Sequence, residues 1–195
     1  MDEKLKKRIA ELVKEEISIV PYDKGWIKMF NDEAGYLKEI LPSEIVKRIE
    51  HFGSTAVKGL SAKPIIDILV EVSSSEETKK LIVPLLEAKG YEQFWRPSFG
   101  DDGPPYYHWF IKRNSKGYRT HHIHMVEAGS ELWDRLFFRD YLRQFPEERK
   151  RYDELKRKLS NEYPADRIKY TEEKSSFIIS ITKKAKKYYE SGSVL

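Results

Sequence analysis

The chain contains no cysteine. This absence excludes a disulfide framework, a thiolate metal site and a cysteine nucleophile. Long apolar runs are also missing, because the stretch at 65–70 is interrupted by Asp67 and is far too short to cross a membrane. The first 16 residues are charged and lack the apolar segment of a signal peptide. We therefore expect a cytoplasmic protein with no membrane partner.

Charged and aromatic residues are plentiful instead, at 35% and 13% of 195 residues. A hydrophobic fraction of 39% excludes collagen-like and fully disordered chains, and the length suits one domain with its own core. The 36 Lys and Arg residues exceed the 32 Asp and Glu residues by 4. This excess favours anionic partners such as nucleotides and leaves nucleic acid open without requiring it. The oligomeric state stays undetermined.

Hydrophobic periodicity predicts helices at both ends of the chain and strands in the middle. Helices are expected over 4–13, 23–40 and 76–89, and then from Ser130, Pro146 and Asp166 onward. Strands are expected over 45–52, 64–72 and 91–96, followed by a hairpin of 106–113 and 118–127. Pro84 should kink or split the helix that contains it.

This order of elements predicts an α+β fold, because the helices are segregated from the strands. We expect a mixed β-sheet with flanking helices and a helical C-terminal part. The predicted organisation is an N-terminal helical extension over 1–16, an α/β core over 17–129 and a helical region over 130–195 that packs on the core.

The most informative segment is 51–72, HFGSTAVKGLSAKPIIDILVEV. A strand runs into Gly53 and Ser54, a short turn follows, and a second strand carries Asp67. A glycine lets the backbone approach a ligand closely, and a serine hydroxyl with nearby backbone N–H groups can hold phosphate. A carboxylate inside an apolar strand must be paired or bind a metal.

Several motifs together carry a resemblance. They are HFGSTAV at 51–57, GL at 59–60, AKPIIDI at 62–68, HIH at 122–124, FRDYLR at 138–143, and Tyr152, Leu155, Lys156, Tyr170 and Lys174. From about Val20 to the C-terminal helix the chain resembles the GrpB-like family, which has the nucleotidyltransferase fold. The resemblance implies a core with the nucleotidyltransferase architecture, and a site for a nucleoside triphosphate and a divalent metal.

The resemblance assigns roles only where the residues match. In nucleotidyltransferases a Gly-Ser pair opens a helix that holds triphosphate, and two acids separated by one residue bind two metal ions. Gly53 and Ser54 match the first element, and Asp67 matches the first acid. Leu69 stands where the second acid is expected, which argues against standard two-metal transfer. Glu71 keeps the same strand face but lies one step too far along.

His122 and His124 point to one face of their strand, since side chains alternate. If that strand neighbours the one that carries Asp67, the three side chains could hold a divalent ion: Mg²⁺, Mn²⁺ or Zn²⁺. Two imidazoles with one carboxylate favour Zn, Mn or Fe over Mg. The alternative is that the histidines hydrogen-bond phosphate or structural carboxylates.

Basic residues of the C-terminal helices form a second candidate feature. Arg139 and Arg143 are four residues apart and share a helix face, and Lys156 and Lys174 follow. They could form a positive rim around an anionic substrate. Alternatively, the arginines pair on the surface with carboxylates, namely Asp140, Glu147 or Glu148.

Lys63 precedes the strand that carries Asp67, so it could reach phosphate or pair with that aspartate. The predicted function is a nucleotidyltransferase-like enzyme that acts on a nucleotide or phosphorylated small molecule. Asp67, His122 and His124 would be its catalytic residues and metal ligands. The predicted phosphate-binding residues are Gly53, Ser54, Lys63, Arg139, Arg143 and Lys156. The alternative is a non-catalytic nucleotide-binding module with a degenerate metal site.

Overall fold

A computed structural model describes residues 17–97 and 106–191 of the chain. The helix expected over 4–13 lies outside the described residues. The division of the chain at 16 and 129 stays a prediction.

Five strands form one mixed sheet in the order β1-β2-β5-β4-β3. Their bounds are β1 Val46–Phe52, β2 Ile66–Val72, β3 Glu92–Pro97, β4 Tyr106–Arg113 and β5 Arg119–Val126. The central strands β2 and β5 pair in parallel, and the other neighbours are antiparallel. The prediction of an α+β fold with a mixed sheet is confirmed.

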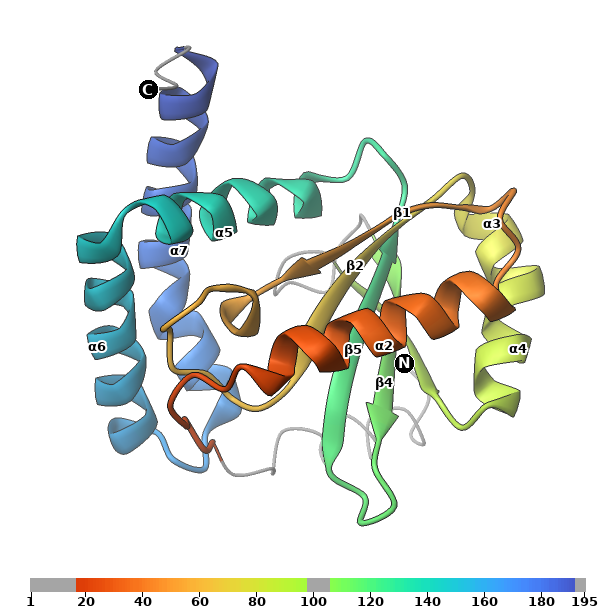
Figure 1. The fold of residues 1–195 in the computed structure, drawn as a ribbon, viewed down its shortest axis with the longest axis horizontal. Helices are drawn as coiled ribbons and strands as arrows, with labels where there is room; N and C mark the ends of the chain where they lie inside the picture. Colours follow the sequence, from red (N-terminus) through yellow and green to blue (C-terminus); the bar gives the residue numbers. More distant parts are fainter. Residues whose placement is uncertain (1–16, 98–105, 192–195) are drawn as a thin grey trace.

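The longer helices lie around this sheet, with α5, α6 and α7 grouped at one end (Figure 1). The helices are α2 Gly25–Ile40, α3 Ser75–Glu77, α4 Val83–Ala88, α5 Asp134–Gln144, α6 Pro146–Glu162 and α7 Arg167–Glu190. Two 3-10 turns, η1 Ser54–Ala56 and η3 Glu131–Trp133, precede β2 and α5. Among the described helices, none combines the length and apolar character needed to span a bilayer.

The helix predicted over 76–89 is split, as Pro84 led us to expect. Its middle is a π-helical turn, η2 Thr78–Ile82, and Pro84 lies in the first turn of α4. The backbone N–H of Val83 bonds to the carbonyl oxygen of Thr78, five residues back, so the wider π-helical turn leads directly into the segment that holds Pro84. At the other end, Ser74 caps α3 by accepting a hydrogen bond from the backbone N–H of Glu77 at 3.2 Å.

Helices α2 and α4 cover one face of the sheet. Ile66, Ile68 and Val70 of β2 pack there with Leu37 of α2 and Leu86 of α4 in one cluster. These five side chains are fully buried. Burial of each contributes about 2 kcal/mol, so this cluster fixes β2 in the middle of the sheet.

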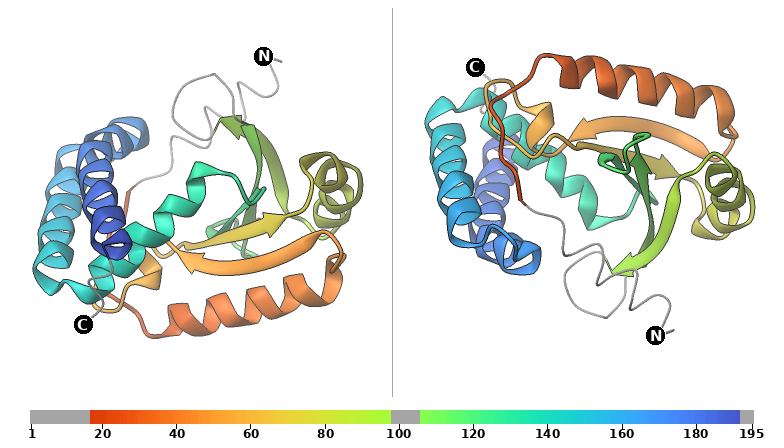
Figure 2. Two further views of the ribbon diagram at one scale, coloured as in Figure 1. Left: turned by 90° about the horizontal axis from the view of Figure 1, so that it is seen from above. Right: turned by 90° about the horizontal axis from the view of Figure 1, so that it is seen from below.

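The opposite face of the sheet carries a second, smaller cluster, in which Leu69 and Trp109 pack under Leu132. In both views of Figure 2, α2 and α5 lie on opposite sides of β1 and β2. Helices α5 to α7 also pack on the turn after β1 through a third cluster that contains Val57 and Ile181. This arrangement leaves the polar start of β2 facing the C-terminal helices.

Candidate active site

Parallel pairing of β2 and β5 places Asp67 opposite His122 and Leu69 opposite His124. The Nδ1 atom of His122 lies 3.2 Å from Oδ1 of Asp67. One potential ligand atom from each of Asp67, His122 and His124 lies within 4.8 Å of the others. The sequence analysis predicted a shared site only if the strand of His122 and His124 neighbours that of Asp67, and the two strands are neighbours. The structure therefore brings the three side chains together, and their roles remain a prediction.

Gly53 turns the chain tightly against Asp67. Its φ of 71° and ψ of −172° belong to a region that is essentially restricted to glycine. A Cβ atom at this position would lie 2.4 Å from Oδ2 of Asp67. The position therefore requires glycine twice, for its backbone angles and for its lack of a side chain.

The local environment keeps the imidazole neutral and the carboxylate charged. Burial lowers the pKa of His122 to about 4, although Asp67 acts in the opposite direction. Burial alone would raise the pKa of Asp67, but the hydrogen bond from His122 holds it below its ordinary value. Among the described residues, Nε2 of His122 is buried without a hydrogen-bond partner. A neutral imidazole beside a carboxylate is the form that binds a metal or accepts a proton.

Aromatic side chains enclose the two histidines. The hydroxyl of Tyr107 lies 2.9 Å from Nδ1 of His124. The ring of Phe52 meets the His124 ring edge-on at 5.1 Å, and the Trp109 ring lies 5.0 Å from that of His122. These contacts fix the orientation of both imidazoles.

Asp67 and His122 line a cavity of about 180 Å³. The turn after β1 contributes Gly53 and Ser54 to the same cavity. Its other walls come from the segment before β2 and from the C-terminal helices, through Lys63, Tyr152, Lys156, Tyr170 and Lys174. The structure thus brings together six of the predicted site residues that lie far apart in the sequence.

Three lysines give this cavity an unusual electrostatic character. Burial lowers the pKa of Lys156 to about 7 and that of Lys174 to about 8. Burial, together with Arg167 and Lys174, also holds the pKa of Lys63 well below its ordinary value. Within the described part of the chain, no carboxylate forms a salt bridge with any of the three amines; Lys156 donates instead to the backbone carbonyl of Ser61.

Two tyrosines position these amines. The Tyr170 ring lies 5.2 Å from Nζ of Lys63 and 4.1 Å from Nζ of Lys174, and the Tyr152 ring lies 5.0 Å from Nζ of Lys156. Burial raises the pKa of Tyr152 to about 12, so its hydroxyl stays protonated beside Ser54. Both tyrosines occur in the motifs that carry the resemblance, but nothing in the sequence assigned them to a cavity wall.

Comparison with known proteins assigns the chain to a family. The family model described as GrpB protein matches residues 16–184. The chain belongs to the GrpB family. The "Glutamate-rich protein GrpB" of Alkalihalophilus pseudofirmus is 38% identical over 169 residues, which cover 86% of this chain and 95% of that relative. The resemblance inferred from the motifs is confirmed.

A solved structure of a relative agrees with the family assignment. The crystal structure of GrpB from Enterococcus faecalis matches with a TM-score of 0.75 and 36% identity, over 88% of this chain and 99% of the other. The Cid1 poly(U) polymerase matches at a TM-score of 0.45 and 13% identity, over 82% of this chain and 48% of that one. The second likeness is too low to carry an argument about activity, which must come from the site itself.

In this member of the GrpB family, Arg139 does not reach the cavity as the sequence led us to expect. Its guanidinium group donates to the carboxylate of Asp140 at 2.7 and 2.9 Å and to Glu50 at 2.9 Å. It also donates to the backbone carbonyl of His51 at 2.7 Å. All of these partners belong to the protein, so Arg139 joins α5 to β1.

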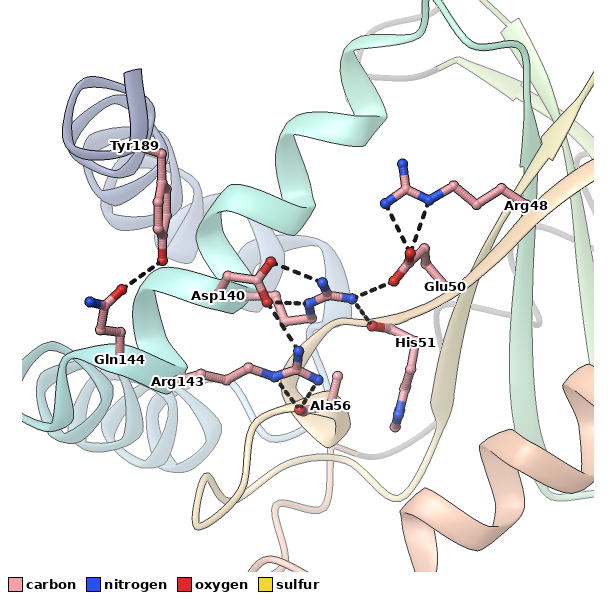
Figure 3. A network of polar contacts seen from close by, with 9 residues as sticks. Arg48, Glu50, His51, Ala56, Asp140, Arg143, Gln144 and Tyr189 are labelled. Atoms are coloured by element: carbon pink, nitrogen blue, oxygen red, sulfur yellow. Dashed lines mark hydrogen bonds and ion pairs between the residues drawn. The ribbon is translucent and has the colours of Figure 1, made fainter. Parts of the chain in front are cut away.

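Arg143 has the same kind of role. It donates two hydrogen bonds to the carbonyl oxygen of Ala56, at 3.0 and 2.9 Å, and a third to Asp140 at 3.0 Å (Figure 3). The alternative that the arginines pair with Asp140 is confirmed. Neither arginine lines the cavity: Arg139 holds α5 against β1, and Arg143 holds it against the η1 turn. A role of the two arginines at phosphate stays a prediction.

Leu69, which stands where nucleotidyltransferases have a second acid, is part of the hydrophobic core. Leu69 is fully buried among the side chains of the second cluster, which include Phe52 and Trp109. Glu71 lies on the same face of β2, four residues beyond Asp67, which is about 13 Å along a strand. Neither residue can supply an oxygen ligand beside Asp67, so the geometry differs from a pair of acids separated by one residue.

Proposed function

We propose that this protein is a nucleotidyltransferase-like enzyme that acts on a nucleotide or another phosphorylated small molecule bound in the cavity. One observation carries the proposal. Asp67 and His122 line the cavity together with Lys63, Lys156 and Lys174, and no carboxylate of the described residues forms a salt bridge with these three amines. A charged carboxylate in one cavity with several amines suits phosphoryl chemistry, which depends on positioning and on stabilisation of charge.

Charge identifies the ligand class. Buried amines gain from an anion because it compensates for the desolvation of their charged form. The cavity volume of about 180 Å³ corresponds to roughly six water molecules, at about 30 Å³ each. This volume fits the phosphate-bearing end of a ligand, and the remainder of a nucleotide would extend toward solvent. The hydroxyl of Ser54 at the cavity wall offers a donor to the same phosphate.

The proposed reaction forms a bond between an acceptor oxygen and the α-phosphorus of a nucleoside triphosphate. The bond from that phosphorus to pyrophosphate breaks, and pyrophosphate leaves with the bonding electron pair. The lysines would neutralise the charge that grows on this leaving group. Asp67, which is held in its charged form, would accept the proton of the acceptor hydroxyl.

The test is a screen of nucleoside triphosphates with Mg²⁺, Mn²⁺ and Zn²⁺ and with small hydroxyl acceptors, read out as pyrophosphate release. Asp67→Asn should lower turnover by about a hundredfold or more, since loss of a positioned base has an effect of that size. His121→Gln is the matched control, because His121 points to the opposite face of β5. Equal turnover by Asp67→Asn and the unaltered protein would contradict the proposal.

A second candidate is a nucleotide-binding module without catalysis. It is favoured by Leu69, whose burial in the core leaves the second metal position without an oxygen ligand. Under this alternative, nucleotides bind and Lys174→Met weakens their binding, but no pyrophosphate is released in any combination of the screen. Calorimetric titration with nucleotides beside the activity screen separates the two functions.

A further inference from the structure

We propose that Asp67, His122 and His124 hold a single transition-metal ion, Zn²⁺ or Mn²⁺, and that the hydroxyl of Tyr107 positions His124 to bind it. This inference deepens the proposed function, because it concerns the same cavity wall and specifies the number and kind of ion. It differs from the paired Mg²⁺ ions that two neighbouring acids would hold.

The distances fit a common ion. One potential ligand atom from each of the three side chains lies within 4.8 Å of the others, and Nδ1 of His122 is 3.2 Å from Oδ1 of Asp67. Ligands about 2.1 Å from a tetrahedral ion lie about 3.4 Å from each other. Small rotations of the side chains would therefore close the site, and no backbone movement is required.

The donor set selects the ion. Two imidazole nitrogens and one carboxylate suit Zn²⁺ or Mn²⁺, whereas Mg²⁺ prefers oxygen ligands in an octahedral shell. A second ion would need oxygen ligands where Leu69 stands. That side chain is fully buried among apolar neighbours. The site is therefore built for one ion.

The Nε2 atom of His122 is buried, and a cation would supply the partner that it lacks among the described residues. A buried polar atom without a partner costs about 1–3 kcal/mol. Coordination by His122 would offset this cost, either through Nε2 or through the Nδ1 atom that now faces Asp67.

The hydroxyl of Tyr107 fixes the orientation of the His124 imidazole. This hydroxyl contacts Nδ1 at 2.9 Å, and the ring of Tyr107 is buried in the second cluster, so the position of the hydroxyl is fixed. A hydroxyl that accepts the Nδ1 proton leaves Nε2 as the basic nitrogen of the imidazole. Tyr107 is therefore a positioning residue, since it would act on the ion only through His124.

The experiment uses the full chain after removal of metals with a chelator. Calorimetric titration with Zn²⁺, Mn²⁺ and Mg²⁺, together with elemental analysis, gives the affinity and stoichiometry. We expect one equivalent of Zn²⁺ or Mn²⁺ and binding of Mg²⁺ weaker by about a hundredfold or more. His122→Ala and Asp67→Asn should abolish this binding, and His121→Gln should retain it.

Tyr107→Phe tests the positioning role, since it keeps the buried ring and removes only the hydroxyl. We expect metal affinity to fall by about 10- to 100-fold and the visible spectrum of the Co²⁺-loaded protein to shift. A purely packing role for the hydroxyl would leave that spectrum unchanged. Absence of stoichiometric binding of any tested ion, or binding that survives both His122→Ala and Asp67→Asn, would overturn the inference.

Sulfate binding to the metal-free protein shows whether a negative result concerns the metal site or the proposed function. If sulfate binds at the lysines and no metal binds, the metal inference is wrong and the anion site stands. If the metal binds as expected and neither sulfate nor any nucleotide does, the proposed function is wrong and the metal site stands.

Discussion

Two basic regions of this molecule look alike in the sequence and differ in the structure. On α5, the donors of Arg139 and Arg143 are used by carboxylates and backbone carbonyls of the protein itself. In the cavity, Lys63, Lys156 and Lys174 have no carboxylate in salt bridge among the described residues, and all three have a lowered pKa. The first region joins parts of the fold to each other, and the second is the region that we propose as a ligand site.

The comparison gives a physical criterion for a binding site. Arg139 has a raised pKa: burial disfavours its charge, but hydrogen bonds from the guanidinium to Asp140 and Glu50 outweigh that effect. For the cavity lysines, burial has the larger effect on the pKa, and the attraction of Asp67 and Asp153 does not outweigh it. A cation that the protein leaves uncompensated is a better indicator of an anion site than a cation with internal partners.

The largest expected effect is on stability, at Arg139. Arg139→Ala removes the buried guanidinium that joins Glu50, Asp140 and the carbonyl oxygen of His51, and it leaves that carbonyl without this donor. We expect the free energy of unfolding to fall by about 3 kcal/mol. Chemical denaturation measures it. Arg48→Ala is the control, since the half-exposed pair of Arg48 with Glu50 should contribute at most about 1 kcal/mol.

Because Arg139 does not line the cavity, Arg139→Ala should leave anion binding in the cavity unchanged as long as the variant is folded. Sulfate affinity, measured at a temperature where the variant is folded, should equal that of the unaltered protein. A tenfold loss of sulfate affinity at unchanged stability would reverse the assignment and make Arg139 a ligand residue.

The next effect in size is on ligand affinity, at Lys174. Lys174→Met removes one of three cavity amines, and we expect sulfate or pyrophosphate to bind about tenfold more weakly, which is about 1.4 kcal/mol. Isothermal titration calorimetry measures this loss. Lys183→Met on the same helix is the control, because Lys183 is exposed and lies outside the cavity. Equal affinities in both variants would remove the lysines from the site.

The smallest effect is the response of binding to pH. In the proposed site the charged amines of Lys156 and Lys174 would bind the anion, and these groups lose their protons with pKa values of about 7 and about 8. Sulfate keeps its charge over this range, so its affinity should fall several-fold as pH rises from 7 to 9. Titrations at several pH values measure the trend, and an affinity that is flat or rises with pH contradicts the lysine assignment.

The sequence predicts the elements well because their signals are local. Side-chain alternation along β5 places His122 and His124 on one face, and the apolar run of β2 predicts a strand buried on both sides. Pro84 marks the break in the helix that contains it. Each of these inferences depends on residues that are neighbours in the chain.

Contacts across the chain explain what the sequence could not predict. Arg139 bonds to Glu50 and His51, which are 89 and 88 positions away, so nothing near Arg139 shows that its donors are already used. The hydroxyl of Tyr107 meets His124 only because β4 pairs with β5. The cavity depends likewise on the position of α7 relative to β2, which packing determines.

We propose that the cavity beside Asp67 is an anion site whose lysines form no salt bridge with a carboxylate of the described residues. The most direct test is a crystal of the full chain soaked with tungstate, a phosphate mimic that is located by its anomalous scattering. The account predicts one strong site within hydrogen-bond distance of the amines of Lys63, Lys156 and Lys174. Tungstate bound at Arg139 and Arg143 with the cavity empty would contradict it.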